Sequence, residues 1–141
     1  MIERLNAKHL KYIASTKKDF VDAWDYKMLE SGINNRSLYG FVALDGKTPV
    51  GYISFSIAVD SSDIECVFVE EAFRRKGYAN LLMQSAIDFL KEKKVVKILL
   101  EVRESNLSAI SLYNKFGFEQ ISQRKKYYFD GENALVLIKE L

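Results

Sequence analysis

The chain has 141 residues, the usual length of one globular domain, and such a domain buries roughly 70% of its unfolded surface. Hydrophobic residues make up 48% and charged residues 28%, which argues against disorder and against a small disulfide-stabilised fold. A net charge of +2 is too small to indicate nucleic-acid binding, and no apolar run approaches the roughly 18 residues of a membrane-spanning helix. We therefore predict one domain, residues 1–141, without a membrane role.

The cysteine content indicates a reducing compartment. Cys66 is the only cysteine, so no internal disulfide is possible. Residues 1–5 also lack the basic segment that leads into the apolar core of a secretory signal. We predict a cytoplasmic protein.

The first elements in chain order are helical and are followed by a hairpin. Apolar residues recur at mixed helical spacing over residues 7–30, which predicts one or two amphipathic helices. Residues 39–44 and 51–57 have the composition of strands and flank an Asp45-Gly46 pair, a strong hairpin signal. The apolar residues of the helical region are Leu10, Ile13, Phe20, Val21, Trp24, Met28 and Leu29.

A strand, a basic turn and a helix come next. Residues 63–69 form the predicted strand, and the helix extends over about 78–93. Helical spacing places one apolar face on this helix, made of Leu82, Met83, Ala86, Phe89 and Leu90.

The last third of the chain predicts a buried strand, a short helix and two further strands. Residues 96–102 are almost continuously apolar, which is typical of a strand buried on both faces. Ser105 and Asn106 can cap a short helix that ends at Gly117. Two strands, at about 118–123 and 134–138, complete a mixed α/β order.

The turn between the strand at 63–69 and its helix has the features of an anion site. Free amide groups at a helix start can donate to a phosphate, and Gly77 lets the backbone approach the phosphate closely. Arg74, Arg75 and Lys76 oppose the helix dipole by typically 0.3–1 kcal/mol each, a cost that a bound anion would offset. The alternative is an ordinary basic turn. The turn is too short for a Walker A motif and lacks the glycines of a dinucleotide fingerprint.

A second group of chemically interesting residues follows. Glu101 stands inside the most apolar strand, where desolvation should raise its pKa unless a cation compensates. A carboxylate of raised pKa is a plausible base, and the alternative is a strand-end salt bridge with Arg103 or Lys125.

The short helix adds a tyrosine. Asn106, Ile110 and Tyr113 share one helix face, since Tyr113 follows Asn106 by two turns. Tyr113 is either a functional hydroxyl or a core aromatic with its hydroxyl at the rim.

Two strings of residues together resemble the GNAT acetyltransferase superfamily. One is residues 74–79, and the other is Leu100-Glu101-Val102-Arg103-x-Ser105-Asn106-x-x-Ala109-Ile110-x-Leu112-Tyr113-x-x-x-Gly117-Phe118. The second string is similar to the bacterial ribosomal-protein-alanine N-acetyltransferases. The resemblance spans residues 39–141 and is specific from 65 to 118, whereas residues 1–38 match only in general character.

The resemblance implies a fold and a co-substrate. The fold is a mixed, mostly antiparallel sheet flanked by helices and splayed between its middle strands to form an acetyl-CoA cleft. The pyrophosphate would lie on the turn, the pantetheine and thioester along the preceding strand, and the CoA arm against Asn106. The cofactor-binding residues implied are Val67, Phe68, Val69, Arg75, Lys76, Gly77, Tyr78, Ala79, Asn80 and Asn106. We expect no metal ion.

The resemblance also assigns the chemistry. Glu101 would accept the proton of an ammonium, directly or through water, and Tyr113 would protonate the departing thiolate, with direct transfer of the acetyl group. Asp63 and Glu65 share one face of the strand where other members of the superfamily carry their base, so they are rivals of Glu101. A nucleophilic role for Cys66 has little support, because the only histidine, His9, lies far upstream.

The predicted acceptor is a primary amine, in particular the N-terminal α-amine of a ribosomal or other protein. Residues 124–129 resemble the tyrosine-containing loop that holds the substrate N-terminus in protein N-acetyltransferases, although Phe129 stands where proline is usual. The alternatives are a small amine or lysine side chain as acceptor, a noncatalytic acyl-CoA-binding module, and a nucleic-acid module, which the charge disfavours. We expect a monomer or weak dimer without direct nucleic-acid contact.

Overall fold

A single seven-stranded sheet organises the computed structural model, which describes residues 1–16 and 26–141. Its strand order is β1-β2-β3-β4-β5-β7-β6, and every neighbouring pair is antiparallel except β4 and β5. The strands are β1 (Ile2–Arg4), β2 (Tyr39–Asp45), β3 (Thr48–Ala58), β4 (Ser61–Val69), β5 (Lys97–Arg103), β6 (Glu119–Arg124) and β7 (Ala134–Glu140). The predicted hairpin and the order of the remaining strands are confirmed.

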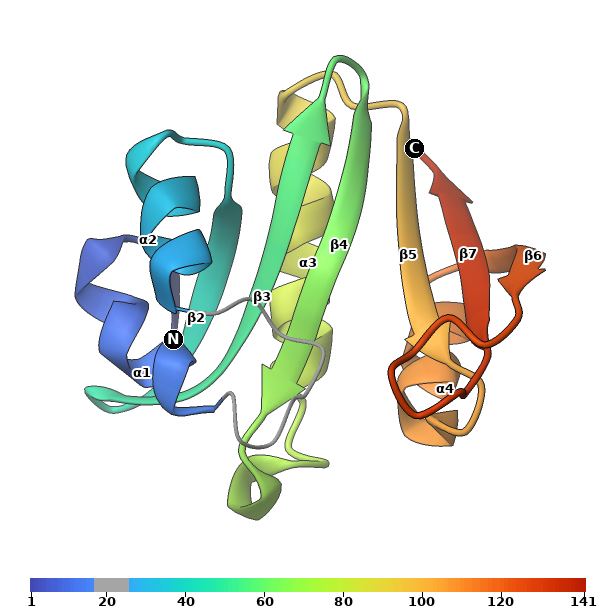
Figure 1. The fold of residues 1–141 in the computed structure, drawn as a ribbon. Helices are drawn as coiled ribbons and strands as arrows, with labels where there is room; N and C mark the ends of the chain where they lie inside the picture. The colour runs from blue at the N-terminus through green and yellow to red at the C-terminus, as the bar shows by residue number, and fades with distance from the viewer. Residues whose placement is uncertain (17–25) are drawn as a thin grey trace.

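Helices cover both faces of the sheet (Figure 1). On one face α1 (Leu10–Ser15), with the short 3-10 helix η1 (Ala7–His9) before it, buries Leu10 and Ile13 against β2, β3 and β4. Helix α2 (Tyr26–Asn34) lies beside α1. Two helices thus occupy the region predicted to be helical, while Phe20, Val21 and Trp24 lie outside the described residues.

The opposite face carries α3 (Tyr78–Glu92) and α4 (Leu107–Lys115). The main apolar core fills the space between this face and α3. The helix face predicted for α3 is confirmed, since four of its five residues are buried and Phe89 packs against the same core. The short helix also begins and ends as predicted: the Asn106 side chain accepts from the Ala109 amide, and Gly117 follows with a φ of 88°.

The sheet opens between β4 and β5. These two strands are paired only along Ser61–Ile64 and Lys97–Leu100, after which they diverge (Figure 1). A bulge at Glu65 accompanies the divergence, because Ser54 pairs with Cys66 and Phe55 pairs with Ile64, which leaves Glu65 without a partner in the register. Bulges bend a strand and redirect side chains, and they are common beside active sites.

The prediction that residues 96–102 are buried on both faces is wrong. Burial alternates along β5, with Ile98, Leu100 and Val102 buried but Lys97 and Glu101 exposed. The physical reason is that only one face of β5 packs into the core that contains α3, through Ile98, Leu100 and Val102, whereas the other face borders a cavity. The apolar Leu99 lines this cavity instead of a closed core.

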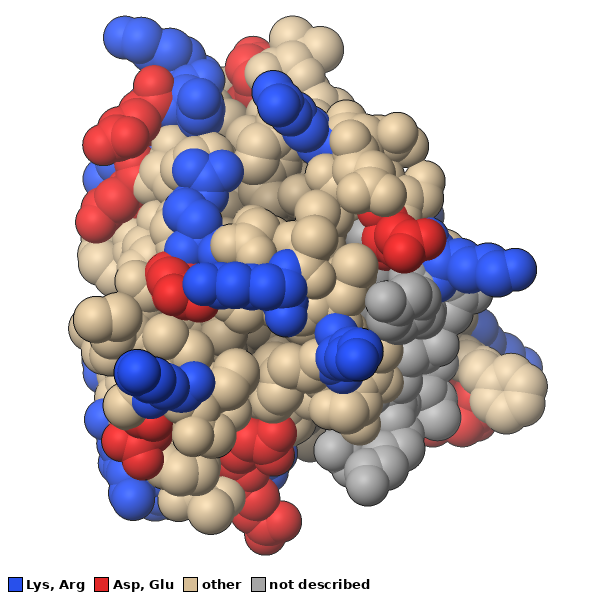
Figure 2. Space-filling view, turned by 90° about the vertical axis from the view of Figure 1, so that its left-hand side faces the viewer, with Lys and Arg blue, Asp and Glu red and all other residues tan. Residues whose placement is uncertain are grey.

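The surface carries charges of both signs. On the face shown in Figure 2, lysine and arginine side chains are interspersed with aspartate and glutamate, so this face has no extended basic patch. None of the helices in the described part of the chain has the length and apolar composition needed to span a bilayer.

Candidate active site

Two cavities meet where β4 and β5 diverge. The first, of about 500 Å³, is bounded by β4, the turn before α3, and α4, and we call it the turn-side cavity. The second, of about 640 Å³, is bounded by β4, β5 and the loop between β6 and β7, and we call it the loop-side cavity. Val67, Asn106 and Tyr113 line both cavities. Two differently built cavities therefore adjoin at these three residues, where the sheet is open.

The turn before α3 faces the turn-side cavity with unoccupied donors. Gly77 is the N-cap of α3, has a φ of 88° and supplies no side-chain cap. The residues of the first turn line the cavity, so their amides, which have no acceptor within the helix, can donate to a ligand there. A Cβ at position 77 would meet nothing within 4 Å, so the space above this backbone is open. An anion fits this helix start.

Arginine side chains complete the turn. The Nε of Arg74 donates to the carbonyl of Val69 at 2.8 Å, which ties the turn to the end of β4. Arg75 lines the cavity and has a positive φ of 61°, an uncommon conformation for a residue with a side chain. These cations next to free amides match the charge of a pyrophosphate.

Nine of the ten residues predicted to hold the cofactor line this cavity. The residues brought together are Val67, Phe68, Val69, Arg75, Gly77, Tyr78, Ala79, Asn80 and Asn106. Lys76 is the exception: it does not line the cavity, and its ammonium lies 5.3 Å from the centroid of the Phe73 ring, so its contact with the cofactor stays a prediction. Lys76 lies between Arg75, which has a φ of 61°, and the N-cap Gly77, and it is exposed to solvent.

Helix α4 supplies a wall of the turn-side cavity that our sequence analysis missed. Its lining residues are Ser108, Ala109, Ser111, Leu112, Tyr113 and Lys115. Ser108, Ser111, Leu112 and Lys115 follow the i, i+3, i+4, i+7 spacing of one helix face. Small and polar residues at that spacing were the available signal.

Glu101 lines the loop-side cavity but is not the desolvated carboxylate that its sequence context predicts. It is exposed, and the Nη1 of Arg124 donates to both of its oxygens at 3.0 and 3.2 Å. The alternative of a salt bridge is thus correct in kind, but its partner is Arg124 of β6 rather than Arg103 or Lys125. The apolar run around Glu101 reflects burial of its neighbours on the other face of β5.

Asp63 and Glu65 line the same cavity as Glu101. Burial, the nearby Asp63 carboxylate and, more weakly, Glu101 raise the pKa of Glu65, while a 3.4 Å hydrogen bond from Ser56 opposes this. The bulge at Glu65 therefore places a partly desolvated carboxyl group in an acidic cavity.

Tyr113 lies at the junction of the two cavities. Its side chain is 7% exposed, and burial raises the pKa of its hydroxyl well above the usual range, so the hydroxyl stays protonated at neutral pH. Burial likewise raises the pKa of Cys66 to about 11, and its thiol donates to the Tyr52 hydroxyl at 3.5 Å. A protonated thiol is a poor nucleophile, which gives no support to covalent chemistry at Cys66.

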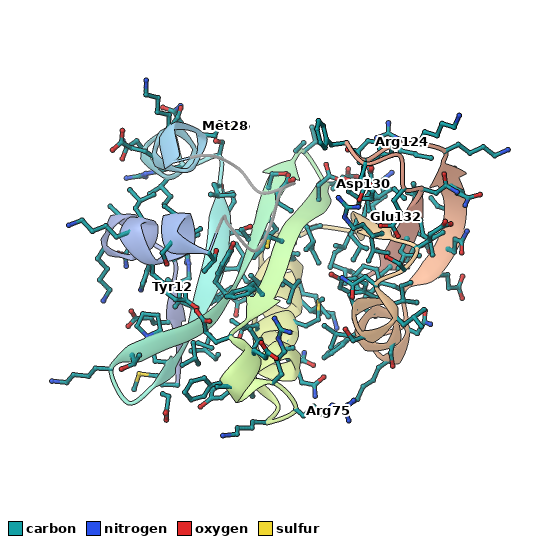
Figure 3. All side chains as sticks on the ribbon, turned by 60° about the horizontal axis from the view of Figure 1, so that its bottom comes forward. Tyr12, Met28, Arg75, Arg124, Asp130 and Glu132 are labelled. Atoms are coloured by element: carbon teal, nitrogen blue, oxygen red, sulfur yellow. The ribbon has the colours of Figure 1, made fainter. Side chains whose placement is uncertain are left out.

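The loop between β6 and β7, residues 125–133, borders the loop-side cavity through Tyr127, Tyr128 and Asp130. Figure 3 shows Asp130 and Glu132 together beside β5, with Arg124 near them and Arg75 at the opposite end of the opened sheet. The turn before α3 and the tyrosine-bearing loop therefore border two adjoining cavities.

Comparisons with known proteins agree with this geometry. The model of the acetyltransferase (GNAT) family matches residues 9–118. The chain is 34% identical over 117 residues to a putative [ribosomal protein bS18]-alanine N-acetyltransferase of Bacillus subtilis, covering 82% of this chain and 75% of the relative. It is 32% identical over 131 residues to an N-alpha-acetyltransferase of Saccharolobus solfataricus, covering 84% and 78%.

A solved structure shares the fold over almost the entire chain. The ribosomal-protein-S18-alanine N-acetyltransferase of Escherichia coli superposes with a TM-score of 0.89 at 24% identity, covering 99% of this chain and 92% of that one. The splayed, mostly antiparallel sheet expected from the sequence is thus the fold of that acetyltransferase. From its family match and its two curated relatives, the chain belongs to the acetyltransferase (GNAT) family and is an acetyl-CoA-dependent N-acetyltransferase.

Proposed function

We propose that this enzyme acetylates the N-terminal α-amine of a protein, with the N-terminal alanine of a ribosomal protein as the leading acceptor. The observation that best supports this proposal is that the two cavities adjoin, with a shared wall formed by Val67, Asn106 and Tyr113. An acetyl donor in one cavity and an amine in the other would meet at this wall. The relatives named for alanine and N-alpha acetylation support the choice of acceptor.

The turn-side cavity is the proposed site of acetyl-CoA, which supplies the acetyl group as a thioester. The amides of Gly77, Tyr78, Ala79 and Asn80, with Arg75, would hold the pyrophosphate. Val67, Phe68 and Val69 lie beyond the last β4–β5 pair, Ile64 with Leu100, and line the turn-side cavity, so this part of β4 is the proposed contact of the pantetheine arm. Asn106 would contact the same arm from the start of α4.

In the loop-side cavity, Glu101 is the proposed proton acceptor. An ammonium must lose a proton before its nitrogen can attack a thioester. Arg124 pairs with Glu101 through a solvent-exposed contact, which water and salt screen, so an incoming ammonium can compete for the carboxylate. Glu65 is the rival, because its raised pKa makes it a stronger base than an ordinary glutamate.

Tyr113 is the proposed proton donor to the leaving thiolate. It lines both cavities and keeps its proton at neutral pH, the two properties that this role requires. The chain then needs no acyl-enzyme, in agreement with the protonated state of Cys66.

Thiol release from acetyl-CoA with a panel of acceptors tests the proposal. The panel contains short peptides with free N-terminal Ala, Ser or Met, the same peptides with blocked N-termini, and polyamines. We expect release with the free peptides and none with the blocked ones. Release with polyamines alone would assign a small-amine acceptor, and acetyl-CoA binding without any reaction would favour a noncatalytic module.

A further inference from the structure

One guanidinium connects the tyrosine-bearing loop of residues 125–133 to strand β5. Arg103 is the last residue of β5. Its Nη1 donates to Asp130 Oδ2 at 2.8 Å and to Glu132 Oε1 at 2.9 Å. Its guanidinium carbon also lies 4.1 Å from the centroid of the Tyr128 ring. Three loop residues are therefore held by one side chain.

This contact is more shielded than an ordinary surface ion pair. The side chains of Arg103 and Glu132 are each only 19% exposed, whereas the Arg124 side chain in the pair with Glu101 is 54% exposed. A planar guanidinium that bridges two carboxylates and stacks on a ring restricts all of its partners at once. Lysine, with a single point of charge, cannot reproduce this arrangement.

The contacts of Glu132 extend to the wall that the two cavities share. The second carboxylate oxygen of Glu132 accepts a hydrogen bond from the Ser105 amide at 2.8 Å. Ser105 precedes Asn106, which caps α4 and lines both cavities. The loop is consequently fixed to the wall at which donor and acceptor would meet.

Inside the loop, backbone contacts transmit this restraint to the tyrosines. The Tyr128 amide donates to the Glu132 carbonyl, and the Gly131 amide donates to the Tyr128 carbonyl, at 3.1 and 2.8 Å. The loop is thus a closed turn, which Arg103 and Ser105 hold at Asp130 and Glu132, while Glu104 contacts Asn133 and Arg124 lies 4.9 Å from the Tyr127 ring centroid. Tyr127 and Tyr128 project from this turn to the loop-side cavity.

We propose that Arg103 is a positioning residue for acceptor recognition, which holds Tyr127 and Tyr128 over the loop-side cavity and thereby sets the affinity for the acceptor peptide. This inference rests on the proposed function, since it assigns the loop-side cavity to the acceptor. Arg103 itself lines the loop-side cavity at the end of β5 but does not line the turn-side cavity. Its loss should affect peptide binding and leave acetyl-CoA binding intact.

The test compares Arg103→Gln and Arg103→Lys with the wild-type enzyme. Arg4→Gln is a matched control, because Arg4 also stacks on a ring, 4.5 Å from the Phe89 centroid, but lies on the edge strand β1 and lines neither cavity. We expect Arg103→Gln to raise the peptide KM roughly tenfold or more, because misplaced binding groups are costly. The kcat at saturating peptide and the Kd for acetyl-CoA should stay near wild type, and Arg103→Lys should recover only part of the KM.

Amide hydrogen exchange provides a readout that does not depend on activity. Arg103→Gln should speed exchange at the loop amides Tyr128 and Gly131 and at Ser105, whereas Arg4→Gln should not. An unchanged peptide KM together with unchanged loop exchange would overturn the inference. A wild-type enzyme that acetylates no peptide would instead refute the proposed acceptor, and exchange would still show whether Arg103 holds the loop.

Discussion

Four carboxylates of the described residues, Asp63, Glu65, Glu101 and Asp130, line the loop-side cavity, and their surroundings differ. Glu101 is paired with Arg124, whereas Glu65 is partly desolvated beside a like charge. Geometry favours Glu101 as the group that receives the acceptor proton, because it lies on β5 near the tyrosine-bearing loop. Basicity favours Glu65.

We expect Glu101→Gln to lower kcat by about 10²-fold or more, the usual contribution of a general base, with little change in the Kd for acetyl-CoA. Glutamine keeps the shape of the side chain and removes only its capacity to take a proton. Glu65→Gln is the matched control on β4, and steady-state rates with calorimetric titration of acetyl-CoA provide the measurement. A wild-type rate in Glu101→Gln with a large loss in Glu65→Gln would move the base to β4.

Ser62 makes a separate prediction about stability. Its hydroxyl oxygen is buried, and within the described residues it has no hydrogen-bond partner. A buried unsatisfied polar group costs about 1–3 kcal/mol, so Ser62→Ala should increase the free energy of unfolding by up to about 1 kcal/mol after the small loss of packing. Urea denaturation checks this, with Ser61→Ala, at a more exposed site, as control. A destabilised Ser62→Ala would reveal a partner for this hydroxyl.

At the scale of elements, the order of strands and helices could be predicted because each has its own local signal. The hairpin is predicted by the Asp45-Gly46 pair, α3 by its apolar face and the start of α4 by the Asn106 cap. The exposure of one face of β5 could not be predicted, since it depends on which elements pack against each face of the sheet, a property of the assembled fold and not of the local sequence. The pairing of Glu101 with Arg124 could not be predicted either, because it also depends on how the strands are arranged in the folded chain.

The candidate site follows the same division. The turn at Gly77 is a contiguous motif, so the residues of this turn that line the cavity could be named from the sequence. Only the direction of the Lys76 side chain could not, because it depends on the backbone angles of the turn. The contacts of Arg103 with Asp130 and Glu132 join segments that no motif connects. They became apparent only once β5 and the loop lay side by side.

The loop contacts should respond to acid. Hydrogen bonds from the Glu132 backbone and from Arg103 lower the pKa of Asp130, and bonds from Ser105 and Arg103 lower that of Glu132. Both carboxyl groups have a lower pKa in the folded chain than in the unfolded chain, where the values are about 3.9 for Asp and 4.3 for Glu. Their contribution to stability is therefore complete above the unfolded pKa values and is lost as the pH falls through the lowered, folded values. Exchange-sensitive NMR of the loop amides should therefore show opening below about pH 4 and constant protection from pH 5 to 8. Loss of protection at pH 5–6 would contradict this assignment of the carboxylates.

For the molecule as a whole, the opened sheet explains how a small enzyme brings two substrates together. One half, β1 to β4 with α3, carries the turn proposed to bind the pyrophosphate, and the other half, β5 to β7 with α4, carries the tyrosine-bearing loop (Figure 1). Pairing of β4 with β5 joins the two halves at one end of these strands, and the strands diverge at the other end. The acetyl group would then move through the sheet from one face to the other.

The proposal that donor and acceptor meet between the two cavities is tested most directly by a bisubstrate ligand. In this ligand, CoA is linked through an acetyl bridge to the α-amine of an alanine-initiated peptide. Joining two ligands that occupy connected cavities should strengthen binding about 10²-fold or more over CoA alone. The account predicts that this ligand competes with both acetyl-CoA and peptide in steady-state inhibition. Affinity equal to that of CoA, with competition against acetyl-CoA only, would show that the peptide arm does not reach the loop-side cavity and would contradict the account.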